Sequence, residues 1–433
     1  MEKSDIIIIG AGASGLMAGH VLANAGKRIT VLEARGRIGG RIHTLAGNGF
    51  SMPVELGAEF VHGNLPITLG LLEKAGIGSS DVGFEMWHHH AGKFAQSDEF
   101  VEGWDAFLHK LNQLGEDMPI LDFMEQEFPG EQFRIMRQQI SDYISGYDTA
   151  DVSDAGAFAL RREWNHEDED AQHRVEGGYR ALVNFLADTV RHAGNSIHLN
   201  NVLQEVVWKS GCVRAITTGG KIYEADKIII ALPLGVLRLI AGEQGGVKFS
   251  PPIDRAGLAF RDIGFGSVIK IVMQFNTIFW EDDALGANLS SMGFLFSDET
   301  VPTYWTQSPA HSPLLTGWLG GPAAKAVEGS PKDVILTMAL GSLANIFSMK
   351  EEQLRCRLVA WHVADWTADP FTLGSYAYDK VETPLARKFL SQPMEGTIFF
   401  AGEYLYDGPA IGTVEAALTS GRDTANELLG TEP

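Results

Sequence analysis

The hydrophobic pattern at the start of the chain predicts a strand, a helix and a second strand within 33 residues. Residues 6–9 are four consecutive isoleucines, a run typical of a parallel strand buried on both faces. Glycines at positions 10, 12 and 15 are expected to open a helix, and residues 29–32 predict the next strand, which ends at an acid. This order favours a dinucleotide site over a glycine-rich turn in an unrelated sheet.

Each residue type in this first turn suits one part of a dinucleotide. Gly10 permits the tight turn, Gly12 lets a pyrophosphate approach the backbone, and Gly15 lets the helix pack closely on the strand. The helix N-terminus would face the phosphates, and the acid about 20 residues on would accept hydrogen bonds from a ribose hydroxyl. The residues expected to bind the cofactor here are Gly10, Gly12, Ala13, Ser14, Gly15 and Glu33.

Later segments show both helical and strand patterns. Hydrophobic residues recur at helical spacing over residues 100–145, which predicts amphipathic helices. Residues 268–275 and 291–296 are β-rich runs. Near the end, an apolar strand at residues 398–401 precedes a helix expected over residues 413–429, which would return a second helix N-terminus to the cofactor.

The segment after the second predicted strand distinguishes between dinucleotides. Residues 33–41 read EARGRIGGR, and two cationic side chains and a glycine pair beside the phosphate loop suit FAD, whose ring must reach another domain. This stretch resembles the GRxGGR segment of the flavin-containing amine oxidase superfamily, which includes monoamine oxidases, polyamine oxidases and lysine-specific histone demethylases. The chain looks like a soluble member of bacterial type.

The resemblance recurs along almost the whole chain, in family order. Residues 56–63 (LGAEFVHG) resemble a segment in which polyamine oxidases carry a histidine-glycine pair near the flavin, and residues 231–237 (ALPLGVL) resemble a strand-closing turn. Residues 264–270 (GFGSVIK) are similar to the segment with the active-site lysine. Residues 366–371 (WTADPF) and 374–376 (GSY) resemble the tryptophan and tyrosine segments. Five motifs in order are more specific than any one of them.

These patterns predict an α/β fold in which two domains are interleaved along the chain. We expect a Rossmann-like FAD-binding domain of the GR2 type and an α+β substrate domain that carries a mixed β-sheet and helices. The FAD-binding domain is expected to take residues 1–76, 174–258 and 373–433. The substrate domain is expected to take residues 77–173 and 259–372.

The resemblance implies a larger cofactor site than the glycine turn alone. In the family, the region at Glu403 contacts the ribityl-phosphate part of FAD, and backbone at Thr413 and Val414 faces the pyrimidine end of the ring. Ser375 stands where covalent members carry the cysteine attached to the flavin, so FAD is expected to be held without a covalent bond. The further binding residues implied are Ala34, Arg35, Gly40, Arg41, Gly57, Ala58, Glu59, Val202, Trp366, Gly402, Glu403, Thr413 and Val414.

The same resemblance implies four catalytic residues, Lys270, Tyr376, Thr413 and His62. Lys270 matches a lysine that binds a water beside the flavin, whereas strand alternation alone also allows a solvent-facing lysine on an edge strand. Tyr376 matches one wall of an aromatic cage, and Thr413 replaces the tyrosine of the other wall in monoamine oxidases, which predicts a wider pocket. His62 is either a pocket residue or a hydrogen-bonded histidine at a strand end.

Acidic residues permit cationic substrates without proving them. Glu59 replaces the arginine with which amino-acid oxidases of the superfamily bind a carboxylate, so it would attract a second ammonium. The acidic run at residues 167–170 resembles an entrance for cationic substrates and also suits a solvated loop. The net charge of −21 opposes nucleic-acid binding; it would raise the local concentration of cationic substrates, and an acidic surface kept for solubility is the other interpretation. Three adjacent histidines, residues 88–90, cannot readily converge on one ion, so no metal is expected.

Composition fits a large enzyme in solution. No apolar run reaches the roughly 20 residues needed to span a bilayer, and no secretory signal is visible, so we expect a cytoplasmic protein without a membrane partner. The two cysteines, Cys212 and Cys356, fall in no paired metal or redox motif and are expected to be structural. A homodimer is left open.

The leading hypothesis is an FAD-dependent amine oxidase. It would convert a primary or secondary amine, such as a polyamine, to an imine while O2 is reduced to H2O2, so its partners are a small amine and oxygen. One rival is a desaturase or isomerase of related fold, which would have an apolar membrane-docking surface and no need for Lys270 or Tyr376. The other rival is a flavin-containing binding protein without turnover.

Overall fold

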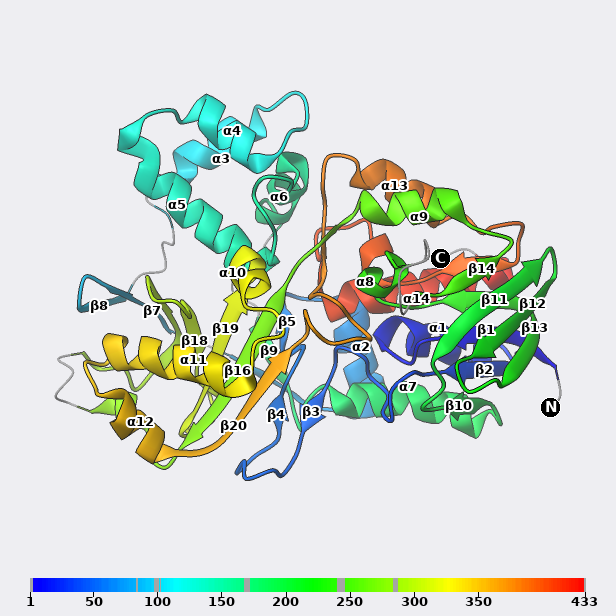
Figure 1. The fold of residues 1–433 in the computed structure, drawn as a ribbon, viewed down its shortest axis with the longest axis horizontal. Helices are drawn as coiled ribbons and strands as arrows, with labels where there is room; N and C mark the ends of the chain where they lie inside the picture. The colour runs from blue at the N-terminus through cyan, green and yellow to red at the C-terminus, as the bar shows by residue number, and fades with distance from the viewer. Residues whose placement is uncertain are drawn as a thin grey trace.

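The computed structural model describes residues 3–82, 85–96, 101, 103–166, 172–239, 246–282 and 287–431. Its ribbon has three parts (Figure 1): a sheet layered with helices, a second sheet beside it, and a helical lobe next to the second sheet. Both the first and the last segments of the chain lie in the first part. The predicted α/β fold is confirmed.

The first sheet has eight strands, five of which form a parallel centre. The strands are β1 (Ser4–Ile9), β2 (Ile29–Leu32), β10 (Ser196–His198), β11 (Leu203–Lys209), β12 (Cys212–Thr217), β13 (Ile222–Ile230), β14 (Lys248–Ser250) and β22 (Ile398–Phe400). All neighbours in the order β10-β2-β1-β13-β22 are parallel. β13 is long enough to pair with β22 at one end and with antiparallel β12 at the other.

Helices cover both faces of this sheet. Ile6 and Ile8 of β1 point into a core formed with α1 (Ala13–Asn24), α2 (Pro66–Ala75), α7 (Arg180–His192) and α14 (Val414–Leu429). Ile7 and Ile9 point into the opposite core, formed with α8 (Leu234–Leu237), α9 (Asp254–Arg261) and α13 (Thr383–Leu390). The isoleucine run is apolar throughout because each face of the strand meets its own core.

The second sheet has seven strands in the order β20-β16-β19-β18-β17-β7-β8. They are β7 (Glu85–His90), β8 (Lys93–Gln96), β16 (Val268–Phe275), β17 (Met292–Ser297), β18 (Thr303–Trp305), β19 (Leu314–Gly320) and β20 (Leu358–Asp365). Ile269, Ile271 and Met273 pack under α11 (Lys332–Ile346) and α12 (Glu351–Arg357). Alternation therefore turns Val268, Lys270 and Val272 to the other face, as the sequence predicts.

The helical lobe consists of α3 (Trp104–Asn112), α4 (Ile120–Glu127), α5 (Arg134–Tyr143) and α6 (Ala157–Trp164) around their own apolar core. The amphipathic helices predicted over residues 100–145 are confirmed by the first three. α5 continues into a π-helical turn, η2 (Ile144–Asp148), and ends at Thr149 with φ +55°. A short 3-10 turn, η1 (Glu131–Phe133), precedes α5, and α10 (Gly321–Ala326) follows β19.

Small sheets join the two large ones. They contain β3 (Thr44–Leu45) with β4 (Val54–Glu55), β15 (Gly264–Phe265) with β21 (Ala377–Tyr378), and the order β5-β9-β6 from β5 (Phe60–His62), β6 (Ser79–Asp81) and β9 (Gln172–Val175). The last of these sheets pairs strands from both sides of the domain boundary expected near residue 76. The boundaries themselves stay a prediction. Further 3-10 turns are η3 (Phe279–Glu281) and η5 (Glu403–Leu405).

Two general properties bear on what the protein can bind. Within the ranges described above, no helix has the length and apolar character that crossing a membrane requires. In the same residues, no grouping of His, Cys, Asp and Glu could hold a metal ion, and both cysteines are free thiols. The acidic run at residues 167–170 lies outside the described residues.

Candidate active site

Glycines shape the turn between β1 and α1. A Cβ on Gly10, whose φ is +102°, would lie 2.5 Å from the Ala231 carbonyl oxygen, and a Cβ on Gly15 would lie 2.0 Å from the Gly10 carbonyl oxygen. Beside Gly12 the space is open, because the nearest atoms, in Gly39 and Gly40, would be 4.0 Å from its Cβ. Packing thus requires glycine at positions 10 and 15, whereas position 12 leaves the backbone accessible.

Polar groups in this turn fit a phosphate-bearing cofactor. Gly12 is the N-cap of α1 and supplies no side-chain cap, so the first backbone N–H groups of the helix are available to a ligand. The Ser14 hydroxyl is buried and has no hydrogen-bond partner among the described residues. A helix N-terminus carries partial positive charge and binds anions. The pyrophosphate of FAD matches this set of donors.

Glu33 closes the turn and keeps capacity for a ribose. Its two carboxylate oxygens accept the backbone N–H groups of Ala11 and Arg35, each at 2.8 Å. An ionised carboxylate can accept about four hydrogen bonds, so both oxygens can still accept a hydroxyl. Asn201 donates its backbone N–H to the Glu33 carbonyl at 2.8 Å, which brings the neighbouring Val202 to the same end of β2. Ala34 follows Glu33 directly in the turn.

The two arginines that were expected to serve the cofactor are held by acids far away in the sequence. Arg35 donates from Nη1 to Asp369 Oδ2 at 2.8 Å and lies over the Trp366 ring, 5.8 Å from its centroid. Arg41 donates to Glu403 Oε1 at 2.9 Å. Both guanidinium groups therefore bridge chain segments, a use that the sequence did not predict.

Close backbone contacts gather the other predicted cofactor residues. A Cβ on Gly57 would lie 1.7 Å from the Arg41 carbonyl oxygen, which also accepts the Ala58 N–H at 3.3 Å. A Cβ on Gly40, whose φ is +58°, would lie 3.3 Å from the Gly12 Cα. On α14, Ser420 accepts the Gly402 N–H at 3.0 Å. Segments near residues 12, 40, 57 and 402 thus lie around one region.

Lys270 lies in a buried charge cluster, which we define as Lys270, Glu59 and Arg174. Lys270 is 1% exposed, and its Nζ donates to Glu59 Oε2 at 2.5 Å and to the Gly57 carbonyl at 3.1 Å. Arg174 donates to the other oxygen of Glu59. Because β16 has β20 and β19 on its two sides, the solvent-facing alternative for Lys270 is excluded.

The charge cluster fixes the ionisation of Glu59. Burial alone would raise the pKa of this carboxyl, but the charges of Lys270 and Arg174 outweigh burial and hold the pKa at about 2. Two cations and one anion leave the cluster with one net positive charge. Glu59 was expected to attract a second ammonium, yet both of its oxygens are occupied by cations of the protein itself.

Arg174 was missed by sequence reasoning. It donates to the carbonyls of Thr306 at 2.9 Å and Ser308 at 3.1 Å, and its guanidinium lies 4.4 Å from the Phe60 ring centroid. No motif surrounds this residue in the sequence. The signal appears only in the strand register, which places Arg174 of β9 directly opposite Phe60 of β5.

An aromatic wall connects Lys270 with Tyr376. The Lys270 ammonium lies 5.2 Å from the Trp305 ring centroid. Successive ring centroids are then 6.0 Å apart for Trp305 and Phe60, 5.7 Å for Phe60 and His62, and 5.7 Å for His62 and Tyr147. Tyr376 donates its hydroxyl hydrogen bond to the Tyr147 carbonyl. The structure therefore brings three of the four predicted catalytic residues, Lys270, His62 and Tyr376, along one wall.

His62 is a hydrogen-bonded histidine at a strand end, and its role as a pocket residue stays a prediction. Its ring lies in the aromatic wall, and its Nδ1 shares a hydrogen bond of 2.7 Å with Gln172 Oε1 on the paired strand. Burial lowers the pKa of His62, and the bond to Gln172 opposes that shift only in part. The imidazole is therefore neutral at ordinary pH.

Thr413, the fourth predicted catalytic residue, caps the helix that follows it. Its hydroxyl accepts the Ala416 N–H at 3.2 Å and donates to the Ala410 carbonyl at 2.7 Å. A Cβ on the preceding Gly412 would lie 2.7 Å from Tyr376 Cδ2, so this turn lies against the tyrosine ring. Thr413 thus positions the start of α14, with Val414 as its first residue, beside Tyr376.

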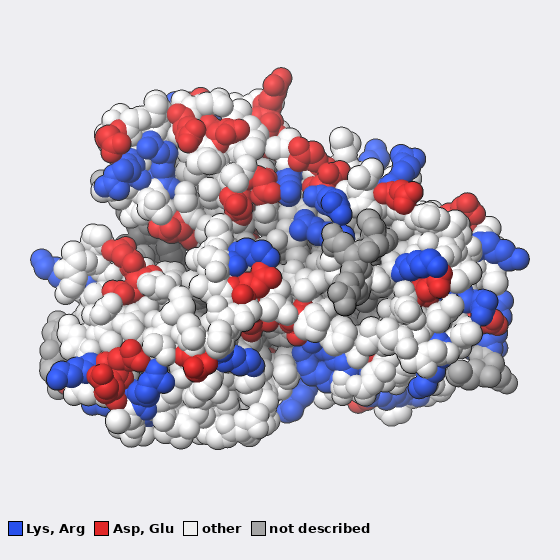
Figure 2. All heavy atoms as spheres, in the orientation of Figure 1, with Lys and Arg blue, Asp and Glu red and all other residues white. Residues whose placement is uncertain are grey.

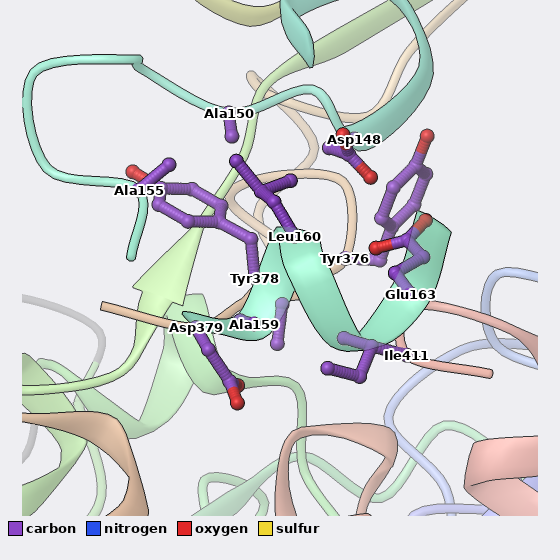
Figure 3. A pocket seen from close by; sticks show the side chains of 11 residues that line it. Asp148, Ala150, Ala155, Ala159, Leu160, Glu163, Tyr376, Tyr378, Asp379 and Ile411 are labelled. Carbon is purple, nitrogen blue, oxygen red and sulfur yellow. The ribbon is translucent and has the colours of Figure 1, made fainter. Parts of the chain in front are cut away.

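A pocket opens beside Tyr376 (Figure 3), and sequence reasoning did not find its acids. Asp148 of η2 and Glu163 of α6 lie next to the tyrosine ring in this view. Burial raises the pKa of Tyr376, and the charge of Asp148 raises it further, so the phenol stays neutral. The lining residues are Asp148, Ala150, Ala155, Ala159, Leu160, Glu163, Tyr376, Ala377, Tyr378, Asp379 and Ile411.

The parallel sheet with its glycine turn fits a dinucleotide-binding protein, and the family model identifies its class as that of the flavin-containing oxidoreductases. The chain belongs to the family of flavin containing amine oxidoreductases, whose family model matches residues 13–429. It is 26% identical to polyamine oxidase 4 of Oryza sativa subsp. japonica, over 98% of this chain and 88% of that protein. It is 27% identical to lysine-specific histone demethylase 2 of Homo sapiens, over 93% of this chain and 50% of that protein.

Solved structures share the fold at low sequence identity. A wild-type putrescine oxidase bound to putrescine superposes with a TM-score of 0.81 at 21% identity, over 99% of both chains. Cyclohexylamine oxidase from Brevibacterium oxydans IH-35A superposes with a TM-score of 0.79 at 18% identity, again over 99% of both chains. The family resemblance predicted from the motifs is confirmed.

Proposed function

We propose that this protein is an amine oxidase that uses non-covalently bound FAD to oxidise a primary or secondary amine, polyamines included, to an imine, with O2 reduced to H2O2. The observation that carries the proposal is the position of the buried Lys270 ammonium. Lys270 lies on β16 of the second sheet, and its ammonium donates to the carbonyl of Gly57, which lies in the cofactor region beside the first sheet. Family membership supports the oxidation of amines. Polyamine and putrescine oxidases among the similar proteins support the wider substrate range.

The chain would hold FAD through groups already described. The N-terminal amides of α1 and the Ser14 hydroxyl suit the pyrophosphate, and Glu33 suits a ribose. The Ser375 hydroxyl, which is hydrogen-bonded to Thr149 at 2.5 Å, offers no thiol for a covalent bond. Once bound, the flavin supplies the two-electron acceptor for the carbon next to the amine nitrogen.

The protein's own residues would orient the amine and exclude water. Tyr376, Tyr147 and His62 form an apolar wall on which an alkyl amine can lie, and such walls remove water from the reacting bond. The Lys270 ammonium, which is bonded to Gly57 in the cofactor region, disfavours a second ammonium nearby and favours the neutral amine. An amine that binds deprotonated needs no general base.

The first test is anaerobic reduction. The yellow protein is mixed separately with spermidine, putrescine, benzylamine and L-leucine, and bleaching of the flavin absorbance is followed. Rapid bleaching by one of the three amines establishes amine oxidation and names the substrate class. If none of the four bleaches a flavin that dithionite still reduces, the desaturase and binding-protein hypotheses take precedence.

The second test is the pH dependence of that reduction. Between about pH 6 and pH 10 the reduction rate should rise with the fraction of neutral amine. Two amines with different pKa values serve as matched substrates, since the midpoint should move with the amine. A rate that stays flat across this range contradicts binding of the neutral amine.

Cellular placement belongs to the same proposal. Figure 2 shows Asp and Glu side chains scattered over the viewed face, with Lys and Arg between them. Such a distribution, with a net charge of −21, suits a protein kept in solution. We therefore propose a cytoplasmic enzyme that acts on small molecules, without nucleic-acid or membrane partners.

A further inference from the structure

We propose that Glu59 is a positioning residue that holds the Lys270 ammonium in one place and sets the charge felt by the bound cofactor. The inference rests on the proposed amine oxidation and adds to it a residue that acts through another. Glu59 would contact neither the substrate nor the oxygen molecule.

The contacts of Lys270 show why it needs Glu59. A lysine ammonium has three donors on a flexible stem, so one partner alone does not fix its position. Here one donor meets Glu59 Oε2 at 2.5 Å and a second meets the Gly57 carbonyl at 3.1 Å. The third donor is then directed by the other two. Without Glu59, the ammonium would lose its directly bonded acid and would keep the Gly57 carbonyl and the Trp305 ring as neighbours.

Glu59 is in turn fixed from the far side. Arg174 donates to its second oxygen, and Gln307 Nε2 lies 3.4 Å from the same oxygen. The Arg174 guanidinium also donates to the backbone carbonyls of Thr306 and Ser308, and these bonds fix its position independently of Glu59. The order Arg174, Glu59, Lys270 therefore links β9, the turn after β4 and β16 into one rigid arrangement.

Other titratable groups face the charge cluster from neighbouring elements. Glu55 of β4 interacts electrostatically with Lys270 and with Glu59, and burial raises its pKa to about 6 against the opposing hydrogen bond from Thr44. His62 of β5 is neutral because burial lowers its pKa. Glu59 is thus the acid bonded directly to Lys270, while Glu55 bonds to Thr44 and to the Tyr179 N–H.

The test measures the midpoint potential of the bound flavin in the holoenzyme, by reductive titration with a reference dye and no amine. Glu59→Gln removes one buried negative charge and should favour the electron-rich reduced flavin about tenfold, a shift of about +30 mV for two electrons. Lys270→Met removes one buried positive charge and should favour the oxidised flavin about tenfold. The double variant removes the pair together and should return to within about threefold of the wild type.

Three further variants separate charge, position and fold. Glu59→Asp keeps the charge but shortens its reach, so its potential should stay near the wild type while kcat falls and KM does not change. Glu73→Gln removes an exposed acid on α2 and should leave the potential unchanged. If Glu59→Gln alone loses FAD, the double variant should retain it, because Lys270 is then absent and Arg174 keeps its bonds to the Thr306 and Ser308 carbonyls.

Two results would overturn the proposal. One is a Glu59→Gln holoenzyme in which the equilibrium between oxidised and reduced flavin stays within about threefold of the wild type. The other is a double variant that loses FAD while Lys270→Met retains it, since Glu59 would then act only on the fold. Neither result depends on turnover, so a protein that no amine reduces would refute the proposed function and still report on Glu59.

Discussion

Two carboxylates at either end of the turn after β4 show how neighbours decide the state of a residue. Glu55 and Glu59 are four positions apart, yet the pKa of Glu55 is raised to about 6 and that of Glu59 is lowered to about 2. Burial acts on both in the same direction. Glu59 faces two cations at bonding distance, whereas Glu55 accepts hydrogen bonds from a hydroxyl and a backbone amide. Hydrogen bonds from neutral donors do not offset the free-energy cost of burying a charged carboxylate.

The opposite shifts predict opposite pH trends in stability. A folded-state pKa of about 2 for Glu59, below the ordinary value of 4.5, stabilises the fold above pH 4.5, and this stability is lost as pH falls toward 2. The shift corresponds to about 3 kcal/mol. For Glu55 the folded value is higher, at about 6, so the ionised acid destabilises the fold as pH rises from 4.5 through 6, by about 2 kcal/mol.

Thermal unfolding of matched variants measures both trends. Glu59→Gln should be less stable than the wild type at pH 7, with a gap that narrows below pH 4.5 and closes as the pH is lowered toward 2. The stability of Glu55→Gln relative to the wild type should be highest at pH 7, where the wild-type acid is ionised, and should fall below pH 5. If both variants follow the same trend with pH, the environments described for the two acids are wrong.

Sequence motifs named Lys270, its partner Glu59 and Tyr376, but they did not name Arg174, which holds Glu59, or Tyr147, which accepts the Tyr376 hydrogen bond. Lys270 stands in a β-rich run beside a family motif, so its strand and its face could be predicted. Arg174 reaches Glu59 across 115 positions of sequence, and no periodicity reports such a contact. Arg35 and Arg41 were assigned to the cofactor because their charge is visible in the sequence, whereas their ion pairs with Asp369 and Glu403 are visible only in the fold.

At the scale of elements, the turn before α1 carries a severe steric demand. Gly15→Ala would place a Cβ 2.0 Å from the Gly10 carbonyl oxygen, so the turn must open. We expect this variant to be purified with less than about a tenth of the wild-type FAD, because the backbone amides of α1 would move away from the phosphates. The ratio of flavin to protein absorbance measures the loss.

A glycine within another helix provides the matched control. Gly341 of α11 has no heavy atom within 4 Å of the position its Cβ would take. Gly341→Ala should therefore retain full FAD and gain roughly 0.5–1 kcal/mol from helix propensity. Equal FAD content in the two variants would show that Gly15 has no special role in the turn.

Element types were predicted best where one period extends over many residues. The apolar strand at residues 398–400, the strand at residues 268–275 and the helix that begins at residue 414 all lie within one residue of the expected bounds. The π-helical turn η2 was not predicted, because it interrupts the helical period for only five residues. That turn carries Tyr147 and Asp148 to Tyr376, so the unpredicted element is the one that shapes the pocket.

At the scale of the whole molecule, both large sheets supply the site. The parallel sheet would hold FAD, and the second sheet supplies Lys270 and Trp305. Denaturing the holoenzyme with acid should release all of its FAD into the supernatant, because Ser375 has no thiol and the free thiols lie on β12 and α12. Yellow colour left in the washed precipitate would contradict non-covalent binding.

Two packed helices of the cofactor domain, α1 and α14, lie near opposite ends of this sequence. α14 packs on α1 so closely that a Cβ on Gly421 would lie 2.1 Å from the Ser14 carbonyl oxygen, and β22 completes the parallel sheet beside β13. Because β1 and α1 are synthesised before β22 and α14, the nascent chain cannot complete this sheet and its pair of packed helices until residues 398–429 have been made.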